Sequence, residues 1–172
     1  MTSKIDICSM ALLKLGEKPI VSFSDDCASA QLARTLYDSV SDTLISLYPW
    51  RFASQKITLV KNSDNNFLIP SNVVRVLKSC GEIIGDRIFA DGDTIEIVGL
   101  VKTMPEKYPT YFISLLSTRL AMEFCIPLTG DNTMFRTLVA LYETELQNAK
   151  FIDSTTSKTT SVNDFSLVSV RF

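Results

Sequence analysis

The stretch Tyr48-Pro49-Trp50-Arg51-Phe52-Ala53 separates the longest helical pattern of this sequence from its first strand pattern. Pro49 disfavours helical backbone at Tyr48 and so predicts the end of the helix. The aromatic side chains of this stretch leave two interpretations open. They form either a corner plug that fixes the helix against a sheet or a recognition knob rich in hot-spot residue types. We favour the plug, because a lone Trp at such a junction is more often part of a core.

Helical periodicity precedes this stretch. Ser3 and Asp6 form a capping-box pattern, which predicts a helix over 3–15. Ser24 predicts the N-cap of a second and longer helix over 24–48. Its apolar residues recur at helical spacing and should face the core: Ala28, Leu32, Leu36, Val40, Leu44 and Leu47. On the opposite face lie Arg34, Asp38 and Asp42, and the spacing of Arg34 and Asp38 predicts a solvated ion pair.

The period changes to that of strands over 52–101. Pro70-Ser71-Asn72 predicts a turn between short strands. Residues 87–90 and 94–98 flank Asp91-Gly92-Asp93, a pattern typical of a β-hairpin. Alternation places Ile88 and Ala90 on one common face, and Ile95 and Ile97 on another. We expect one face of the sheet to lie on the helices.

Helical patterns return after the strands. Pro105 suits a first helical turn and predicts a helix over 105–126 that is apolar over a wide arc. Asp131 predicts the N-cap of a last helix over 131–150. The expected fold is therefore α+β, mainly a bundle of about four helices with a small antiparallel β insertion or hairpin and an extended C-terminal arm.

The C-terminal arm is expected over 153–172, after a single domain over 1–152. Seven of the eight residues from Ser154 to Ser161 are Ser or Thr, a composition that buries too little surface to order itself. We expect the arm to bind a neighbouring subunit or a different protein, or alternatively to fold back on its own domain. The side chains expected to make this contact are apolar: Phe165, Leu167, Val168, Val170 and Phe172.

Composition excludes several kinds of site. The 172 residues, 46% of them hydrophobic, fit one compact domain. The chain has no histidine, which removes Ser-His and Cys-His nucleophile pairs and His-containing zinc sites. Its cysteines are too far apart for a C-x-x-C clamp, and Cys8 and Cys125 fit reduced thiols in a core. No glycine-rich phosphate motif is present. We therefore expect no catalytic residue, no cofactor and no metal ion.

Net charge and hydropathy indicate which classes of partner the chain is suited to bind. With 17 Lys and Arg against 19 Asp and Glu, the chain lacks the cationic excess that grips nucleic acid. We see neither a signal-peptide layout nor the stretch of about 18 apolar residues that a membrane helix needs. Five acids cluster in the hairpin region: Glu82, Asp86, Asp91, Asp93 and Glu96. Such clusters are used by glycosidases and by calcium-binding sites. We disfavour both interpretations, because turns are commonly rich in acids.

A family resemblance rests on stretches within about the first 80 residues. They are Ile5-Asp6-Ile7-Cys8-Ser9-Met10-Ala11-Leu12-Leu13-Lys14-Leu15-Gly16, Pro19-Ile20, Ser22-Phe23, Ala33-Arg34, Leu36-Tyr37, the stretch 48–53 quoted above, and Phe67-Leu68-Ile69-Pro70-Ser71-Asn72-Val73-Val74-Arg75-Val76-Leu77. Together they resemble the head–tail adaptor, or connector, proteins of tailed bacteriophages. The resemblance is closest to the tail tubular protein A type of short-tailed phages.

The resemblance implies a structural virion protein and not an enzyme. Copies of such an adaptor form a ring of about twelve between the portal protein and the tail nozzle protein, and the ring extends the channel through which DNA passes without sequence-specific contact. The implied location is the head–tail interface of the virion, after synthesis in the host cytoplasm and with no membrane partner. Two alternatives stay open: a virion-associated peptidoglycan hydrolase that uses paired carboxylates, and a bacterial scaffold protein or chaperone unconnected with phage.

Overall fold

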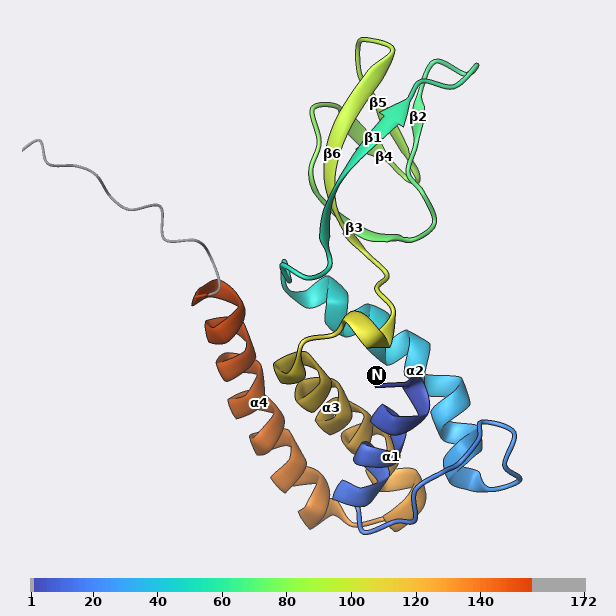
Figure 1. The fold of residues 1–172 in the computed structure, drawn as a ribbon, viewed down its shortest axis with the longest axis vertical. Helices are drawn as coiled ribbons and strands as arrows, with labels where there is room; N and C mark the ends of the chain where they lie inside the picture. The colour runs from blue at the N-terminus through green and yellow to red at the C-terminus, as the bar shows by residue number, and fades with distance from the viewer. Residues whose placement is uncertain (1, 156–172) are drawn as a thin grey trace, which may run out of the picture.

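The computed structural model describes residues 2–155, which fold into a helical part and a β module (Figure 1). The helical part contains α1 (Lys4–Lys14), α2 (Ala28–Leu47), α3 (Thr110–Thr129) and α4 (Asn132–Thr155), with the short 3-10 helix η1 (Pro105–Lys107). The β module comprises residues 54–101. It is inserted between α2 and η1 and projects from one end of the helical part.

The N-terminus of α1 forms the capping box that the sequence predicts. The Ser3 hydroxyl accepts a hydrogen bond from the Asp6 N–H at 3.1 Å, and the Asp6 carboxylate accepts one from the Ser3 N–H at 2.8 Å. These two hydrogen bonds lower the pKa of Asp6. The chain leaves α1 through Gly16, whose φ of +76° suits a residue without a side chain.

The start and the buried face of α2 differ from the expectation. The helix begins at Ala28 and not at 24, because Asp25 accepts hydrogen bonds from the N–H groups of Val21 and Ser22 and so closes the preceding loop. Of the expected apolar stripe, Val40 and Leu44 are buried, Leu32 and Leu36 are half-buried against the core, and Ala28 and Leu47 are exposed. The buried residues are Ala30, Ala33, Tyr37, Val40, Ser41, Leu44 and Ile45. Short alanine side chains let the α2 backbone approach the core, so packing sets the face.

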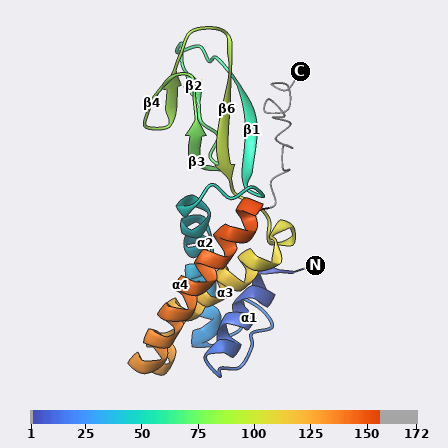
Figure 2. The same cartoon turned by 90° about the vertical axis from the view of Figure 1, so that its left-hand side faces the viewer.

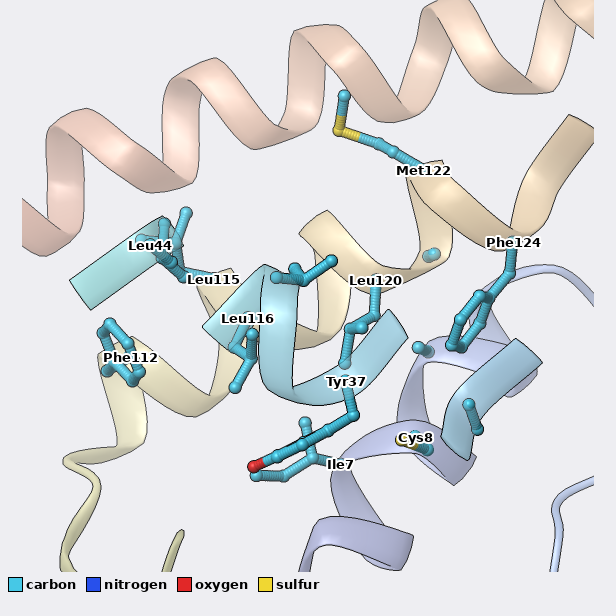
Figure 3. Close-up of a cluster of buried hydrophobic side chains, with 14 of the residues drawn as sticks. Ile7, Cys8, Tyr37, Leu44, Phe112, Leu115, Leu116, Leu120, Met122 and Phe124 are labelled. Atoms are coloured by element: carbon cyan, nitrogen blue, oxygen red, sulfur yellow. The ribbon is translucent and has the colours of Figure 1, made fainter. Parts of the chain in front are cut away.

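Helix α3 occupies the centre of the helical part. Its side chains are buried around much of its circumference, and α1, α2 and α4 each pack against it. Figure 3 shows the resulting core, in which Leu116 and Leu120 of α3 lie near Ile7 of α1 and Tyr37 of α2. Within residues 2–155, α3 alone is long and apolar enough to span a membrane, and 61% of its most apolar stretch is buried inside the protein. Its central position accounts for this composition.

The bounds of α3 and α4 correct three expected boundaries. Pro105 opens η1, and α3 starts only at Thr110; it then continues past Pro127 to Thr129. Gly130, at φ +65°, ends the helix. Asp131 caps α4 as predicted, since its carboxylate accepts hydrogen bonds from the next helical N–H groups. Helix α4 extends beyond the expected end at 150.

Trp50 is the plug of the corner, which we define as residues 48–53. Its side chain is fully buried and its ring packs edge-on against Tyr48 and Phe112, with centroids 4.8 and 5.4 Å away. The indole Nε1 donates a hydrogen bond to the backbone carbonyl of Leu44. The plug interpretation is confirmed, and the interpretation of Trp50 as a surface recognition knob is wrong.

The β module contains two antiparallel sheets, each of three strands. Their orders are β1-β6-β3 and β2-β5-β4. The strands are β1 (Ser54–Val60), β2 (Phe67–Leu68), β3 (Val73–Lys78), β4 (Glu82–Ile84), β5 (Arg87–Phe89) and β6 (Thr94–Val101). The predicted turn at 70–72 is confirmed, because the Val73 N–H donates to the Pro70 carbonyl at 2.9 Å. The module has a core of its own: Leu59, Phe67, Ile88, Ile95 and Ile97.

The expected hairpin of β5 and β6 is wrong. The two strands are consecutive, but β5 pairs with β2 and β4 whereas β6 pairs with β1 and β3. The loop at Gly92, with φ +96°, carries the chain from one sheet to the other. Ile88, Ile95 and Ile97 do share an interior, as the alternation predicts, but that interior lies between strands and not on the helices.

The expected fold class also needs correction. The α+β character is present, but a four-helix bundle with a small β insertion is not what forms. The helices cluster around α3, with little direct contact between α1 and α2, because α3 is the helix that is apolar on most sides. The β region is a two-sheet module with a separate core and not a single hairpin.

Candidate interaction surfaces

The five arm residues expected to bind a partner lie outside the described residues: Phe165, Leu167, Val168, Val170 and Phe172. The structure does give the point from which the arm starts. Helix α4 continues to Thr155, so the arm follows that residue and does not begin at 153. Figure 2 shows this end of α4 beside the root of the β module, on the side of β1.

Asp153 fixes the end of α4 to the corner. Its side chain is only 2% exposed, and it accepts a hydrogen bond from the Tyr111 hydroxyl at 2.6 Å. Both carboxylate oxygens also lie 3.3 Å from the Arg51 backbone nitrogen, which donates to them. Burial and the neighbouring carboxylate raise the pKa of Tyr111. Sequence reasoning placed Asp153 in the arm and missed this contact, which joins residues far apart in the chain.

The charged face of α2 pairs differently from the expectation. Asp38 does not pair with Arg34; its carboxylate lies 2.6 Å from the Lys4 ammonium. Asp42 lies 2.5 Å from the Lys102 ammonium, and this hydrogen bond raises the pKa of Lys102. The expected Arg34–Asp38 ion pair is wrong, because folding brings the first turn of α1 and the segment after β6 against this face.

A cavity of about 360 Å³ opens between these two ion pairs. The hydroxyls of Ser41 and Tyr108 are 2.9 Å apart within it. The buried Tyr37 hydroxyl lies nearby and makes no hydrogen bond of normal geometry within residues 2–155. Burial raises the pKa values of both tyrosines. Since the two ammonium groups at the rim are each paired with a carboxylate, the cavity presents hydroxyl groups and no free charge.

Lys14 is the half-buried amine of the helical part. Its ammonium lies 3.7 Å from Glu145 and donates to the Thr118 hydroxyl. Ser114 and Thr118 also donate to the Glu145 carboxylate, at 3.0 and 2.5 Å. Burial lowers the pKa of Lys14, and the Glu145 charge opposes this effect. Because each of these polar groups has a protein partner, the network connects α1, α3 and α4 and does not present a free nucleophile.

The five acids that the sequence singles out are spread over β4, β6 and the two loops beside β5, and all are exposed. In the described part of the chain, no group of three metal-ligating side chains is placed so that it could hold a metal ion. The five residues are Glu82 on β4, Asp86 between β4 and β5, Asp91 and Asp93 between β5 and β6, and Glu96 on β6.

A groove of about 460 Å³ runs between the two sheets at one side of the β module. We call it the edge groove. Arg75 and Asp86 are the charged side chains that line it, and most of the rest of its lining is apolar: Ile69, Pro70, Val73, Val74, Val76 and Ile83. Sequence reasoning missed the edge groove, because no local pattern shows that β3 and the β4–β5 turn lie next to each other.

Large apolar side chains stay exposed on both parts of the protein. The register of the β2-β5-β4 sheet places Leu68 and Ile84 on either side of Arg87, on the same face as Phe89. All three apolar residues are exposed, with Ile84 at 57%. On the helical part, the exposed side chains include Met10, Leu13, Leu141 and Phe151. Such residues are candidates for contact with other protein surfaces.

No family model matches this chain, and no curated protein matches it either. A function is therefore argued from the sequence resemblance together with the surfaces described above.

Proposed function

We propose that this chain is a head-to-tail adaptor of a tailed bacteriophage. In this role, copies stand side by side in a ring that the portal protein contacts on one face and the tail nozzle protein on the other. DNA passes through the central channel. The adaptor catalyses no reaction and acts by binding other proteins.

One observation carries the proposal: exposed apolar side chains occur at separate places on both parts of the molecule. Phe151 of α4 is 68% exposed and Leu13 of α1 is 60% exposed, while Leu68 and Ile84 are more than half exposed on the β module. A ring subunit needs two side-facing surfaces that differ from each other, and further surfaces for the partners above and below. A protein with a single binding site needs only one such surface.

The resemblance supplies the identity of the partners. Its stretches fall on α1, on the loop after it, on α2, on the corner and on the segment from β2 to β3, which build the helical core and the joint between the two parts. Trp50 of the corner is fully buried, so this part of the resemblance concerns the fold. A net charge of −2 also suits a channel wall along which DNA slides without strong attraction.

Mass photometry of the portal protein, with and without this chain, tests the proposal. We expect the portal complex to gain mass in multiples of 19.2 kDa when the chain is added. A portal protein whose mass stays unchanged at micromolar concentrations of the chain would contradict the proposal. Clearing of cell-wall suspensions by the purified chain would favour the hydrolase instead, and we expect none.

A pair of surface variants sharpens the test. Phe151→Asp replaces an exposed apolar side chain of α4 with a charge, and Gln147→Asp adds the same charge one turn earlier on the same exposed face. If apolar contact through α4 holds neighbouring copies together, Phe151→Asp lowers the number of copies bound to the portal and Gln147→Asp does not. Equal losses in both variants would point to charge alone.

A further inference from the structure

Two edge strands face the edge groove. Strand β3 is one edge of the β1-β6-β3 sheet, and β4 is one edge of the β2-β5-β4 sheet. Four consecutive residues of β3, 73–76, line the groove. Since consecutive residues of a strand point to opposite faces, the groove follows the backbone edge of β3 and not one face of its sheet. Unpaired backbone groups at such an edge can bind a further strand.

The last eight residues of the chain have the pattern of a strand. Phe165-Ser166-Leu167 and Val168-Ser169-Val170-Arg171-Phe172 each alternate apolar with polar residues, which is typical of a half-buried strand. The alternation shifts by one residue between Leu167 and Val168, as it does at a β-bulge. A segment of this kind matches an apolar groove that is bordered by a free strand edge.

The arm starts on the side of the β module opposite the edge groove. Asp153, near the end of α4, accepts hydrogen bonds from the Arg51 N–H, and β1 begins shortly afterwards at Ser54. Strands β1 and β3 are the two opposite edges of one sheet. Residues 156–164 span at most about 30 Å when extended, so they can carry the terminal segment well beyond the end of α4.

We propose that the edge groove of one copy binds residues 165–172 of a neighbouring copy as an added β-strand. This inference rests on the proposed function, since it requires copies that stand side by side. An arm that leaves at the β1 edge and a groove at the β3 edge form a head-to-tail contact, and such contacts close into a ring when the rotation per copy divides a full turn. The Ser and Thr residues before the strand act as the connecting link.

Cross-linking of mixed variants tests the contact in the full chain. The exposed Cys27 and Cys80 are first replaced by Ser. One variant then carries Ser71→Cys in the edge groove, and a second carries Ser169→Cys in the terminal segment. After mixing and treatment with a short bismaleimide, we expect at least tenfold more cross-linked dimer than with a control that carries Ser63→Cys, at the exposed turn before β2. Equal yields from the two mixtures would overturn the proposal.

Two neighbouring isoleucines of β4 provide matched groove variants. Ile83 lines the edge groove, whereas Ile84 points to the other face of the strand and does not line it. Both are exposed, and neither belongs to the core of the β module. We expect Ile83→Lys to lower the cross-link yield at least tenfold and Ile84→Lys to leave it within twofold. If Ile84→Lys lowers the yield as much as Ile83→Lys, the segment does not occupy the groove.

A third arrangement distinguishes contact between copies from contact within one copy. A single chain that carries both Ser71→Cys and Ser169→Cys is treated at high dilution. Efficient cross-linking within the monomer would show that the arm folds back on its own module, and the proposal would fail.

If the chain binds the portal but the mixed variants give no cross-link, this inference fails and the adaptor function stands. If cross-links form but the portal gains no mass, the adaptor function fails and the contact between copies stands.

Discussion

The indole Nε1 of Trp50 donates a hydrogen bond to the backbone carbonyl oxygen of Leu44, and the two atoms are 2.8 Å apart. Leu44 lies in the last turn of α2, where carbonyl groups lack a following helical N–H. The carbonyl of Ser46, in the same turn, accepts a hydrogen bond from the Arg75 guanidinium at 3.0 Å. Side chains from the corner and from β3 therefore satisfy the end of α2 and tie the helix to the β module.

Trp50→Ala should destabilise the isolated chain strongly. The substitution removes a fully buried ring, and losses of this kind cost about 3–5 kcal/mol. Trp50→Phe keeps most of the ring but leaves the Leu44 carbonyl without its donor, which costs about 1–3 kcal/mol. Urea unfolding followed by circular dichroism measures both changes. Leu47→Ala, at an exposed position of the same helix end, is the control and should stay within about 0.5 kcal/mol of the parent.

Asp153→Asn should loosen the end of α4 from the corner. The carboxylate accepts hydrogen bonds from the Tyr111 hydroxyl and the Arg51 N–H, and hydrogen bonds to charged groups contribute about 1.5–3 kcal/mol. Amide hydrogen exchange over the last turn of α4 should become faster. Tyr111→Phe should reproduce part of the effect, and a double-mutant cycle should show coupling between the two sites. Additive effects of the two substitutions would mean that their hydrogen bond contributes nothing.

Cys8 should make the stability of the chain sensitive to alkali. Burial raises the pKa of the Cys8 thiol from 9.0 to about 12, so above pH 9 the unfolded chain loses this proton while the folded chain keeps it. The stability that this group contributes is present below pH 9 and is lost as the pH rises from 9 towards 12. Between pH 8.5 and 10, the parent should lose about 1 kcal/mol more than Cys8→Ala does. Cys27→Ala, at an exposed thiol, should behave as the parent.

Gly81→Ala should disturb the pairing of β4 with β5. A Cβ atom at Gly81 would lie 2.4 Å from the backbone carbonyl oxygen of Phe89, which a strand cannot move without breaking its register. We expect a loss of about 2–3 kcal/mol in the free energy of unfolding. Gly85→Ala is the comparison, because a Cβ there meets no atom within 4 Å but the φ of +62° strains any side chain. It should cost about 1–2 kcal/mol, and a larger loss than that of Gly81→Ala would contradict the contact.

A chain that ends at Thr155 should keep its fold and lose assembly. The buried side chains of the described core all precede that residue, so the free energy of unfolding should change by no more than about 0.5 kcal/mol. Burial of a single large apolar side chain contributes about 1.5–3 kcal/mol, and 1.4 kcal/mol is tenfold in affinity. Loss of the apolar terminal segment should therefore weaken assembly by about tenfold or more. Mass photometry of the truncated and full chains, each with the portal, compares them, and equal assembly would exclude a role for the arm.

The sequence by itself determined those features whose causes lie within a few residues. The Ser3 capping box, the Asp131 cap and the turn at 70–72 depend on hydrogen bonds and backbone restrictions between near neighbours. The burial of Trp50 also has a local cause. Pro49 stops the helix, and the next large side chain must pack at the corner. The positions of β5 and β6 followed from the alternation within their own residues, whereas β4 was not predicted.

Only the tertiary structure decided which elements meet. Strands β5 and β6 join different sheets because each pairs with strands from other parts of the chain. The loop between them would permit a hairpin as well as a crossover from one sheet to the other. Asp38 pairs with Lys4, 34 residues away, in preference to Arg34 on its own helix, because packing of α1 on α3 brings that ammonium to it. The edge groove exists only where two sheets end together. Contacts of this kind depend on the packing of the whole core, and no local pattern in the sequence encodes them.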